Sequence, residues 1–262
     1  MERIRKAQLN LVLLIITLAV NALGAFGYIN GMSQKAVSDM YMTLITPSPS
    51  TFSIWSVIYI LLFVSLITMI VKKDDPYYNR AVDEISILFW ITCFLNVLWI
   101  VLFSFVQIGL SSIFIFAFVI VLAVILKILR KIKQPGKWLL PLTFGLYTGW
   151  LVIATVVNIA AWLVKIQWTG FGLTAEVWSM LTLIIAIVIV FIILLSNKNA
   201  VFPLPIAWAY LGIYQFLKSP EGFAGQYRLL QMVSLAGMAA LIGIAAVQFY
   251  KNQFRILPKS QV

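Results

Sequence analysis

The chain of 262 residues contains no histidine and only one cysteine, Cys93. The absence of histidine removes the commonest metal ligand, the usual haem axial ligand and the usual general base. With a single cysteine, no disulfide can form within the chain. We therefore expect no metal site, no catalytic residues and no resident cofactor, and a protein that is not an enzyme.

Charged residues are also scarce. They make up 10% of the chain, whereas 63% of the residues are hydrophobic and the mean hydropathy is +1.03. A soluble domain carries roughly 25% charged residues. Here the charges gather between apolar runs that are long enough to cross a bilayer, which takes about 20 residues per helix. The fold class expected is an all-α polytopic membrane protein. The predicted spans lie near residues 8–28, 52–71, 85–105, 110–129, 139–163, 177–195, 201–217 and 229–250.

The formal net charge of +11 is unevenly distributed along the chain. If the connecting segments alternate between two sides, all basic residues but four fall on the side of the N-terminus. The four exceptions are Lys35, Lys165, Lys218 and Arg228. Cytoplasmic loops of membrane proteins carry such an excess of Lys and Arg. We therefore expect cytoplasmic termini, and the positive charge requires no nucleic-acid partner. A Lys- and Ile-rich membrane chain favours a bacterial cytoplasmic membrane, with membrane lipid as a partner.

Segment 201–217 leaves two alternatives open. It is short and begins with Pro203 and Pro205, so it either spans the membrane or re-enters without crossing. Re-entry would place the C-terminus on the outer side. The distribution of basic residues hardly separates the two arrangements.

Residues 30–50 form the longest loop on the outer side. Pro47 and Pro49 cannot continue a helix, so the next helix is expected to begin at about Phe52. Loops of this length are often lids over a site. A solvated connector is the alternative.

Aromatic and amide residues share helix faces in the second and third predicted spans. Trp55 and Tyr59 lie one turn apart, and Asn96, Trp99 and Phe103 follow one another at helical spacing. An interfacial aromatic anchor is the simplest interpretation of the first pair. Because an amide in hydrocarbon needs a partner, Asn96 is expected to face the protein interior.

The fifth predicted span carries one further stripe. Tyr147, Trp150, Ala154 and Asn158 follow spacings that place them on one face of a helix. A tryptophan near the middle of the membrane needs a partner for its indole N–H. Together with the small Ala154, it indicates a cavity wall.

Three sequences in these spans together resemble the motifs of one family. They are W-S-V-I-Y, L-N-V-L-W and Y-T-G-W-L-V-I-A-T-V-V-N. They resemble motifs of the TspO/MBR family, the tryptophan-rich sensory proteins related to the mitochondrial translocator protein. The resemblance covers residues 1–165 and implies a five-helix transmembrane domain whose first loop folds over a hydrophobic pocket. Residues 166–262 would add about three transmembrane helices.

The resemblance also implies a function. In the family, the pocket takes tetrapyrroles and other apolar ligands, so we expect an integral membrane protein that binds an apolar or porphyrin ligand under loop 30–50. The residues implied to line or support this pocket are Trp55, Tyr59, Asn96, Trp99, Phe103, Trp150, Ala154 and Asn158, with Pro47 and Pro49 in the lid.

The alternative function is a secondary transporter or permease for a small apolar or neutral solute. Apart from Lys127 at the end of one span, the predicted spans contain no Asp, Glu, Lys or Arg, the residues that relay protons or ions. The oligomeric state also stays open. Ala236, Ala239, Ala240 and Gly243 form a small-residue stripe suited to contact within the chain or with a second copy in a homodimer.

Overall fold

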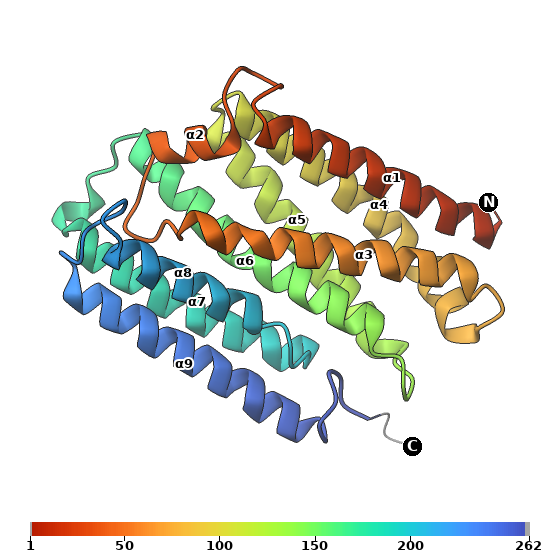
Figure 1. Cartoon of the computed structure of the whole chain (residues 1–262). Coiled ribbons are helices and arrows are strands. Elements are labelled where there is room, and N and C mark those ends of the chain that lie inside the picture. Colours follow the sequence, from red (N-terminus) through yellow and green to blue (C-terminus); the bar gives the residue numbers. More distant parts are fainter. Residues whose placement is uncertain (1, 260–262) are drawn as a thin grey trace.

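A computed structural model describes residues 2–259 (Figure 1), and their regular structure is helical, with no strand. Five long helices precede residue 165, and three helices follow it. This confirms the expected all-α architecture. The helices are α1 (Arg3–Ala25), α2 (Gln34–Met40), α3 (Ile54–Val71), α4 (Pro76–Ser104), α5 (Ile108–Lys131), α6 (Leu139–Lys165), α7 (Ala175–Asn197), α8 (Leu204–Lys218) and α9 (Arg228–Lys251), with short 3-10 turns η1 (Pro49–Ser53) and η2 (Gly170–Gly172).

Seven helical segments in the described residues are long and apolar enough to cross a membrane. They are α1, η1 joined to α3, α4, α5, α6, α7 and α9. The prediction of a polytopic membrane protein is thereby confirmed. Helix α8 has only 15 residues, which corresponds to roughly 22 Å against a hydrocarbon core of about 30 Å.

Local signals account for several helix boundaries. Pro76 occupies the first turn of α4, where its missing N–H costs nothing, and the Asp75 side chain accepts a hydrogen bond from Tyr77 N–H at 2.9 Å. The hydroxyl of Thr174 accepts from Val177 N–H at 3.3 Å and so caps α7. These caps fix where the long apolar helices begin.

Both termini of the described chain lie at the same end of the bundle (Figure 1). We call it the basic end, because it carries most of the Lys and Arg residues. Arg3 pairs there with Asp83 at 2.6 Å, and Lys133 Nζ donates to the Lys259 carbonyl at 3.0 Å. The connecting segments that the sequence assigns to one side therefore meet in the structure.

Helix α8 is one continuous helix that starts near the basic end and runs toward the opposite end (Figure 1). Just before it, Ala200 N–H donates to the Ile256 carbonyl at 2.9 Å at the basic end. Further along α8, the Gly212 carbonyl accepts from Ser48 N–H at 3.0 Å, close to where η1 and α3 begin. Helix α8 is not among the seven segments long and apolar enough to cross a membrane, so both arrangements of segment 201–217 stay open.

One hydrophobic core extends across residue 165. It contains Leu62 and Phe144 as well as Tyr210 and Leu241, all fully buried. A Cβ on Gly149 of α6 would lie 2.2 Å from the carbonyl oxygen of Phe202, so α6 and the turn before α8 are in close contact. The division into two domains at residue 165 stays a prediction.

Candidate functional site

An aromatic cluster surrounds Trp55 at the start of α3. The Trp55 ring stacks on Tyr59 with 5.0 Å between the ring centroids. Trp99, Tyr147 and Trp150 each lie 6.1 Å from it, Tyr147 and Trp150 edge-on and Trp99 tilted. Aromatic pairs favour these separations and geometries. We call these five residues the aromatic cluster.

Three helices place the rings of the aromatic cluster. Helix α3 supplies Trp55 and Tyr59 one turn apart, as their spacing predicts, and α4 supplies Trp99. Helix α6 supplies Tyr147 and Trp150, which are both buried. The structure thus brings together four of the residues that the resemblance implies for the pocket: Trp55, Tyr59, Trp99 and Trp150.

A chain of hydrogen bonds runs beside the aromatic cluster. The Tyr59 hydroxyl donates to Asn21 Oδ1 at 3.1 Å, and Asn21 Nδ2 donates to Asn96 Oδ1 at 2.7 Å. Asn96 Nδ2 in turn lies 3.3 Å from the Tyr147 hydroxyl, which accepts. Asn96 is fully buried, so it faces the interior as the sequence predicts. The chain ties α1, α3, α4 and α6 together.

Asn158 supports the aromatic cluster from one side. Its Oδ1 accepts from Trp99 Nε1 at 3.1 Å. Its Nδ2 donates to Ser112 Oγ at 2.7 Å and Ser111 Oγ at 3.0 Å on α5. The amide is therefore occupied by protein partners, and its role in the structure is to fix the Trp99 indole.

Trp150 differs from the other indoles near the site. Only 2% of its surface is exposed, yet its Nε1 finds no hydrogen-bond acceptor among the described residues. The Phe52 ring lies edge-on against it at 5.9 Å. Because burying an unsatisfied donor costs about 1–3 kcal/mol, this N–H is the feature of the site that most requires an explanation.

Residues 43–53 close the aromatic cluster at the end opposite the basic end, and we call them the cover segment. The predicted lid forms a short helix, α2, and then this irregular stretch. Pro47 is buried within it, whereas Pro49 is exposed and opens η1. The α-helix α3 thus begins at Ile54, after the 3-10 turn η1 and two residues later than the predicted helix start at Phe52.

The cover segment is fastened to α8. Ser48 N–H donates to the Gly212 carbonyl at 3.0 Å, and Ser48 Oγ donates to Gln215 Oε1 at 3.2 Å. The Trp208 indole N–H donates to the Thr51 carbonyl at 2.9 Å. A helix from beyond residue 165 therefore holds the cover of a site built by the first five long helices.

The remaining implied pocket residues are Phe103 and Ala154. Phe103 packs against a separate small hydrophobic group that contains Val37, Ile108 and Ala161. Ala154 is half-buried on α6 and packs against the main core.

The sequence reasoning missed two contributors to the site, Asn21 and Phe52, and a third, Tyr147, was not among the implied pocket residues. Asn21 is an amide within a span, so the desolvation argument used for Asn96 would also have identified it. Tyr147 was already on the predicted stripe of α6. Phe52 carried no signal, because its contact with Trp150 joins segments far apart in the chain.

The aromatic cluster is closed by contact between its own rings. Two cavities found in the described residues, of about 420 Å³ and 250 Å³, both lie at the basic end. Among residues 2–259, no group of three His, Cys, Asp or Glu side chains is placed to hold a metal ion. The buried polar side chains of this region are Asn, Ser and Thr, without an ionisable acid or base.

Comparison with known proteins gives one match. A family model described as TSPO-like protein matches residues 7–248, from α1 into α9. The match therefore continues through α7 and α8, beyond the residues that carry the sequence resemblance. Neither the comparison with curated proteins nor that with solved structures finds a match.

Proposed function

The chain belongs to the TSPO-like family, and from this membership we propose that it is a membrane receptor or carrier for an apolar, planar ligand such as a tetrapyrrole. The ligand would enter the aromatic cluster beneath the cover segment. Trp55, Tyr59, Trp99 and Trp150 would contact it through their ring faces and edges, as aromatic-lined pockets commonly do.

The free indole N–H of Trp150 carries this proposal. It is buried among aromatic rings and has no acceptor in the described residues. A ligand with a carbonyl or carboxylate oxygen would supply that acceptor and remove the cost of the unsatisfied donor. Apolar rings with one convergent polar group are the usual composition of a small-molecule site.

Ligand entry would require the cover segment to move. Its ties to α8 are a few hydrogen bonds, and the Phe52 side chain over Trp150 is 42% exposed. A typical hydrogen bond contributes only about 0.5–1.5 kcal/mol net. Displacing the cover segment would break these bonds and also expose Leu44 and Ile45, which are buried in the main core. The partly exposed Phe52 marks the route by which a ligand would reach the rings.

Coupled transport and catalysis receive less support. The buried polar groups of the described chain are neutral amides and hydroxyls, whereas proton and ion relays in membranes normally use acidic, basic or His side chains. We accordingly propose binding without turnover.

The test is a titration of the purified protein in detergent with protoporphyrin IX. Tryptophan quenching and porphyrin absorbance would be followed in the unaltered protein, in Trp150→Phe and in the control Trp168→Phe. Trp168 packs against Phe171 and Trp178 in the connection between α6 and α7, outside the aromatic cluster. We expect saturable quenching that Trp150→Phe weakens about 3- to 10-fold, the effect of one hydrogen bond, and that Trp168→Phe leaves within twofold.

Three other results would contradict the proposal. Non-saturating quenching would mean partition of the porphyrin into micelles. Equal affinity of the unaltered protein and of Trp150→Phe for the porphyrin would show that the indole N–H does not bind the ligand. A porphyrin spectrum that decays to new products with protein present, in light or in darkness, would indicate an enzyme instead of a receptor.

A further inference from the structure

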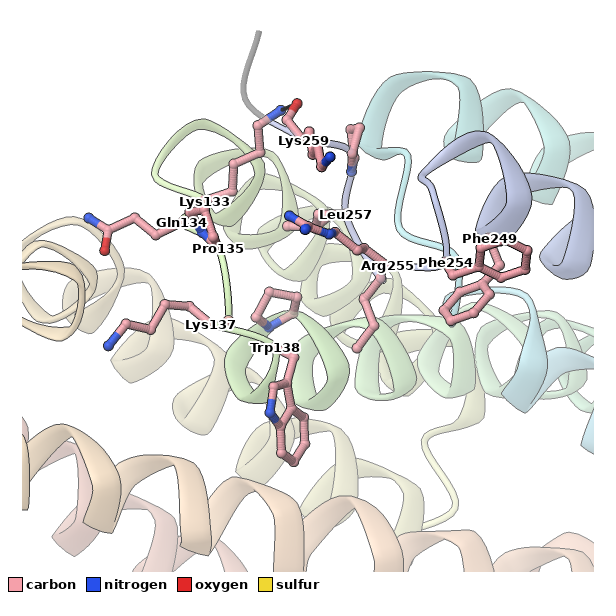
Figure 2. Close-up of a pocket in the computed structure, with 14 residues that line it drawn as sticks. Lys133, Gln134, Pro135, Lys137, Trp138, Phe249, Phe254, Arg255, Leu257 and Lys259 are labelled. Atoms are coloured by element: carbon pink, nitrogen blue, oxygen red, sulfur yellow. Dashed lines mark hydrogen bonds between the residues drawn. The ribbon is translucent and has the colours of Figure 1, made fainter. Parts of the chain in front are cut away.

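A cleft of about 420 Å³ lies at the basic end, between the α5–α6 connection and the segment after α9 (Figure 2). Lys133 and Lys137 line it from the connection, and Arg255 and Lys259 from the segment after α9. Its lining contains no Asp or Glu. The cleft is therefore strongly positive, and it is separate from the aromatic cluster.

One cation of the cleft is already neutralised. Lys137 forms an ion pair with Asp75, and Figure 2 shows its side chain pointing away from Lys133 and Lys259. Among residues 2–259, the ion pairs found do not include Lys133, Arg255 or Lys259. Three positive side chains thus face the cleft without a carboxylate from the described chain.

The surroundings of Lys133 are also positive. Burial and the nearby charges of Arg130 and Lys198 lower the pKa of the Lys133 ammonium below its usual value. Its Nζ donates to the Lys259 carbonyl at 3.0 Å, which draws the two segments together. An anion in the cleft would offset this accumulated positive charge.

The remainder of the cleft is aromatic and apolar. Trp138 and Phe254 line it and are 56% and 71% exposed, and Pro141 and Phe249 lie beside them. Trp138 precedes α6, a predicted span, so it stands at the level where headgroups meet the hydrocarbon. Tryptophan favours this interface because one part of the ring system is apolar and the N–H is polar.

We propose that this cleft binds the phosphate headgroup of an anionic phospholipid from the adjoining leaflet. Lys133, Arg255 and Lys259 contact the phosphate, and Trp138 and Phe254 contact the glycerol and the first acyl carbons. Free inorganic phosphate would contact the same three cations, but it would leave the aromatic rings without a partner. The lipid is the better fit because exposed aromatic rings adjoin the cations at the end of membrane-spanning helices.

The experiment uses the full chain in nanodiscs of phosphatidylcholine, with and without phosphatidylglycerol. Lipid retained after transfer to detergent is counted by native mass spectrometry, and its affinity is obtained by titration. We expect preferential retention of phosphatidylglycerol and an affinity about tenfold lower in the double variant Arg255→Gln with Lys259→Gln, because each basic residue contributes attraction to anionic lipid. The control, Arg5→Gln with Lys72→Gln, makes the same charge change at exposed sites outside the cleft lining and should stay within twofold.

Equal retention of the two lipids would overturn the proposal, and so would an equal loss in the control. A third arm adds inorganic phosphate to the detergent-solubilised protein. The protein could bind phosphate saturably, lose that binding in the cleft variant, and show no preference for phosphatidylglycerol. This combination would assign the cleft to a soluble phosphate and overturn the proposal of a lipid ligand. If the double variant does not give monodisperse protein, Lys133→Gln provides the same test with one substitution.

Discussion

The backbone N–H of Ser48 donates a hydrogen bond to the carbonyl oxygen of Gly212 at 3.0 Å. This bond joins the cover segment to α8, close to where the Thr51 side chain lies against the α8 backbone. A Cβ on Gly212 would lie 1.9 Å from Thr51 Oγ1, so only glycine permits the approach. The site over α3, α4 and α6 thus depends on a helix that lies outside the first five long helices.

Gly212→Ala should loosen the cover segment. The added methyl group must push Thr51 away, and overpacking of this kind typically costs about 1–3 kcal/mol. We expect faster porphyrin exchange by stopped-flow quenching, together with new proteolytic cleavage within residues 43–53. Stability would be measured by thermal unfolding in detergent.

The control for this change is Gly243→Ala in α9. A Cβ at Gly243 meets nothing within 4 Å, and alanine favours a helix over glycine by about 1 kcal/mol. Its exchange rate should equal that of the unaltered protein, and its stability should be equal or higher. Unchanged exchange and cleavage in Gly212→Ala would show that the contact with α8 does not control the cover segment.

Trp150→Phe should separate stability from ligand affinity. The variant removes a buried donor that has no acceptor in the described residues while keeping an aromatic ring against Trp55 and Phe52. Removing an ordinary buried hydrogen bond would cost about 1 kcal/mol, and that loss should be absent here. We expect the unfolding temperature without ligand to fall only by the cost of the cavity that the smaller ring leaves, and a smaller increase on adding protoporphyrin IX. Equal increases in the two proteins would show that the N–H does not contact the ligand.

Tyr59 and Asn21 should be energetically coupled. The hydroxyl donates to the amide at 3.1 Å, and such interhelical bonds in membranes average about 0.6 kcal/mol, with a maximum near 1.7. A double-mutant cycle of Tyr59→Phe and Asn21→Ala, followed by unfolding in denaturing detergent, should return a coupling of this size. Tyr59→Phe with Asn10→Ala is the control, because Asn10 bonds to Ser86 and Trp90 instead. That pair should be additive, and equal couplings in both cycles would contradict the assignment.

Asp75 should make stability depend on acid pH. Its hydrogen bond with Lys137 holds the pKa of the carboxyl below its ordinary 3.8 in the folded protein. The stabilisation is therefore fully present above pH 3.8 and is lost as the pH falls through the lower folded-state pKa. Because the pair is partly exposed, the contribution should not exceed about 1 kcal/mol.

Asp75→Asn isolates this effect. Asparagine still caps a helix well, so the variant keeps the start of α4 and removes only the charge. Thermal unfolding measured between neutral pH and pH 2 should show a smaller acid-induced decrease in the variant than in the unaltered protein. Identical acid-induced decreases in the two proteins would mean that groups other than Asp75 cause the acid sensitivity.

Much of the fold could be predicted from residue order alone. Apolar runs of membrane length, separated by charged clusters, specify long helices and their alternation, because unsatisfied backbone groups are too costly in lipid. Helical spacing also places Trp55 with Tyr59, and Tyr147 with Trp150, on common faces. These properties depend on contacts within one helix, so the sequence by itself determined them.

The tertiary structure decided which of these faces meet. Phe103 and Trp99 are one turn apart on α4, yet Trp99 contacts the Trp55 ring whereas Phe103 packs with Val37, Ile108 and Ala161. The missing acceptor of Trp150 and the cleft beside Arg255 likewise arise where distant segments come together. Periodicity fixes the direction of a side chain about its own helix axis. It does not fix which neighbouring helix lies in that direction, and only packing of the whole chain determines that.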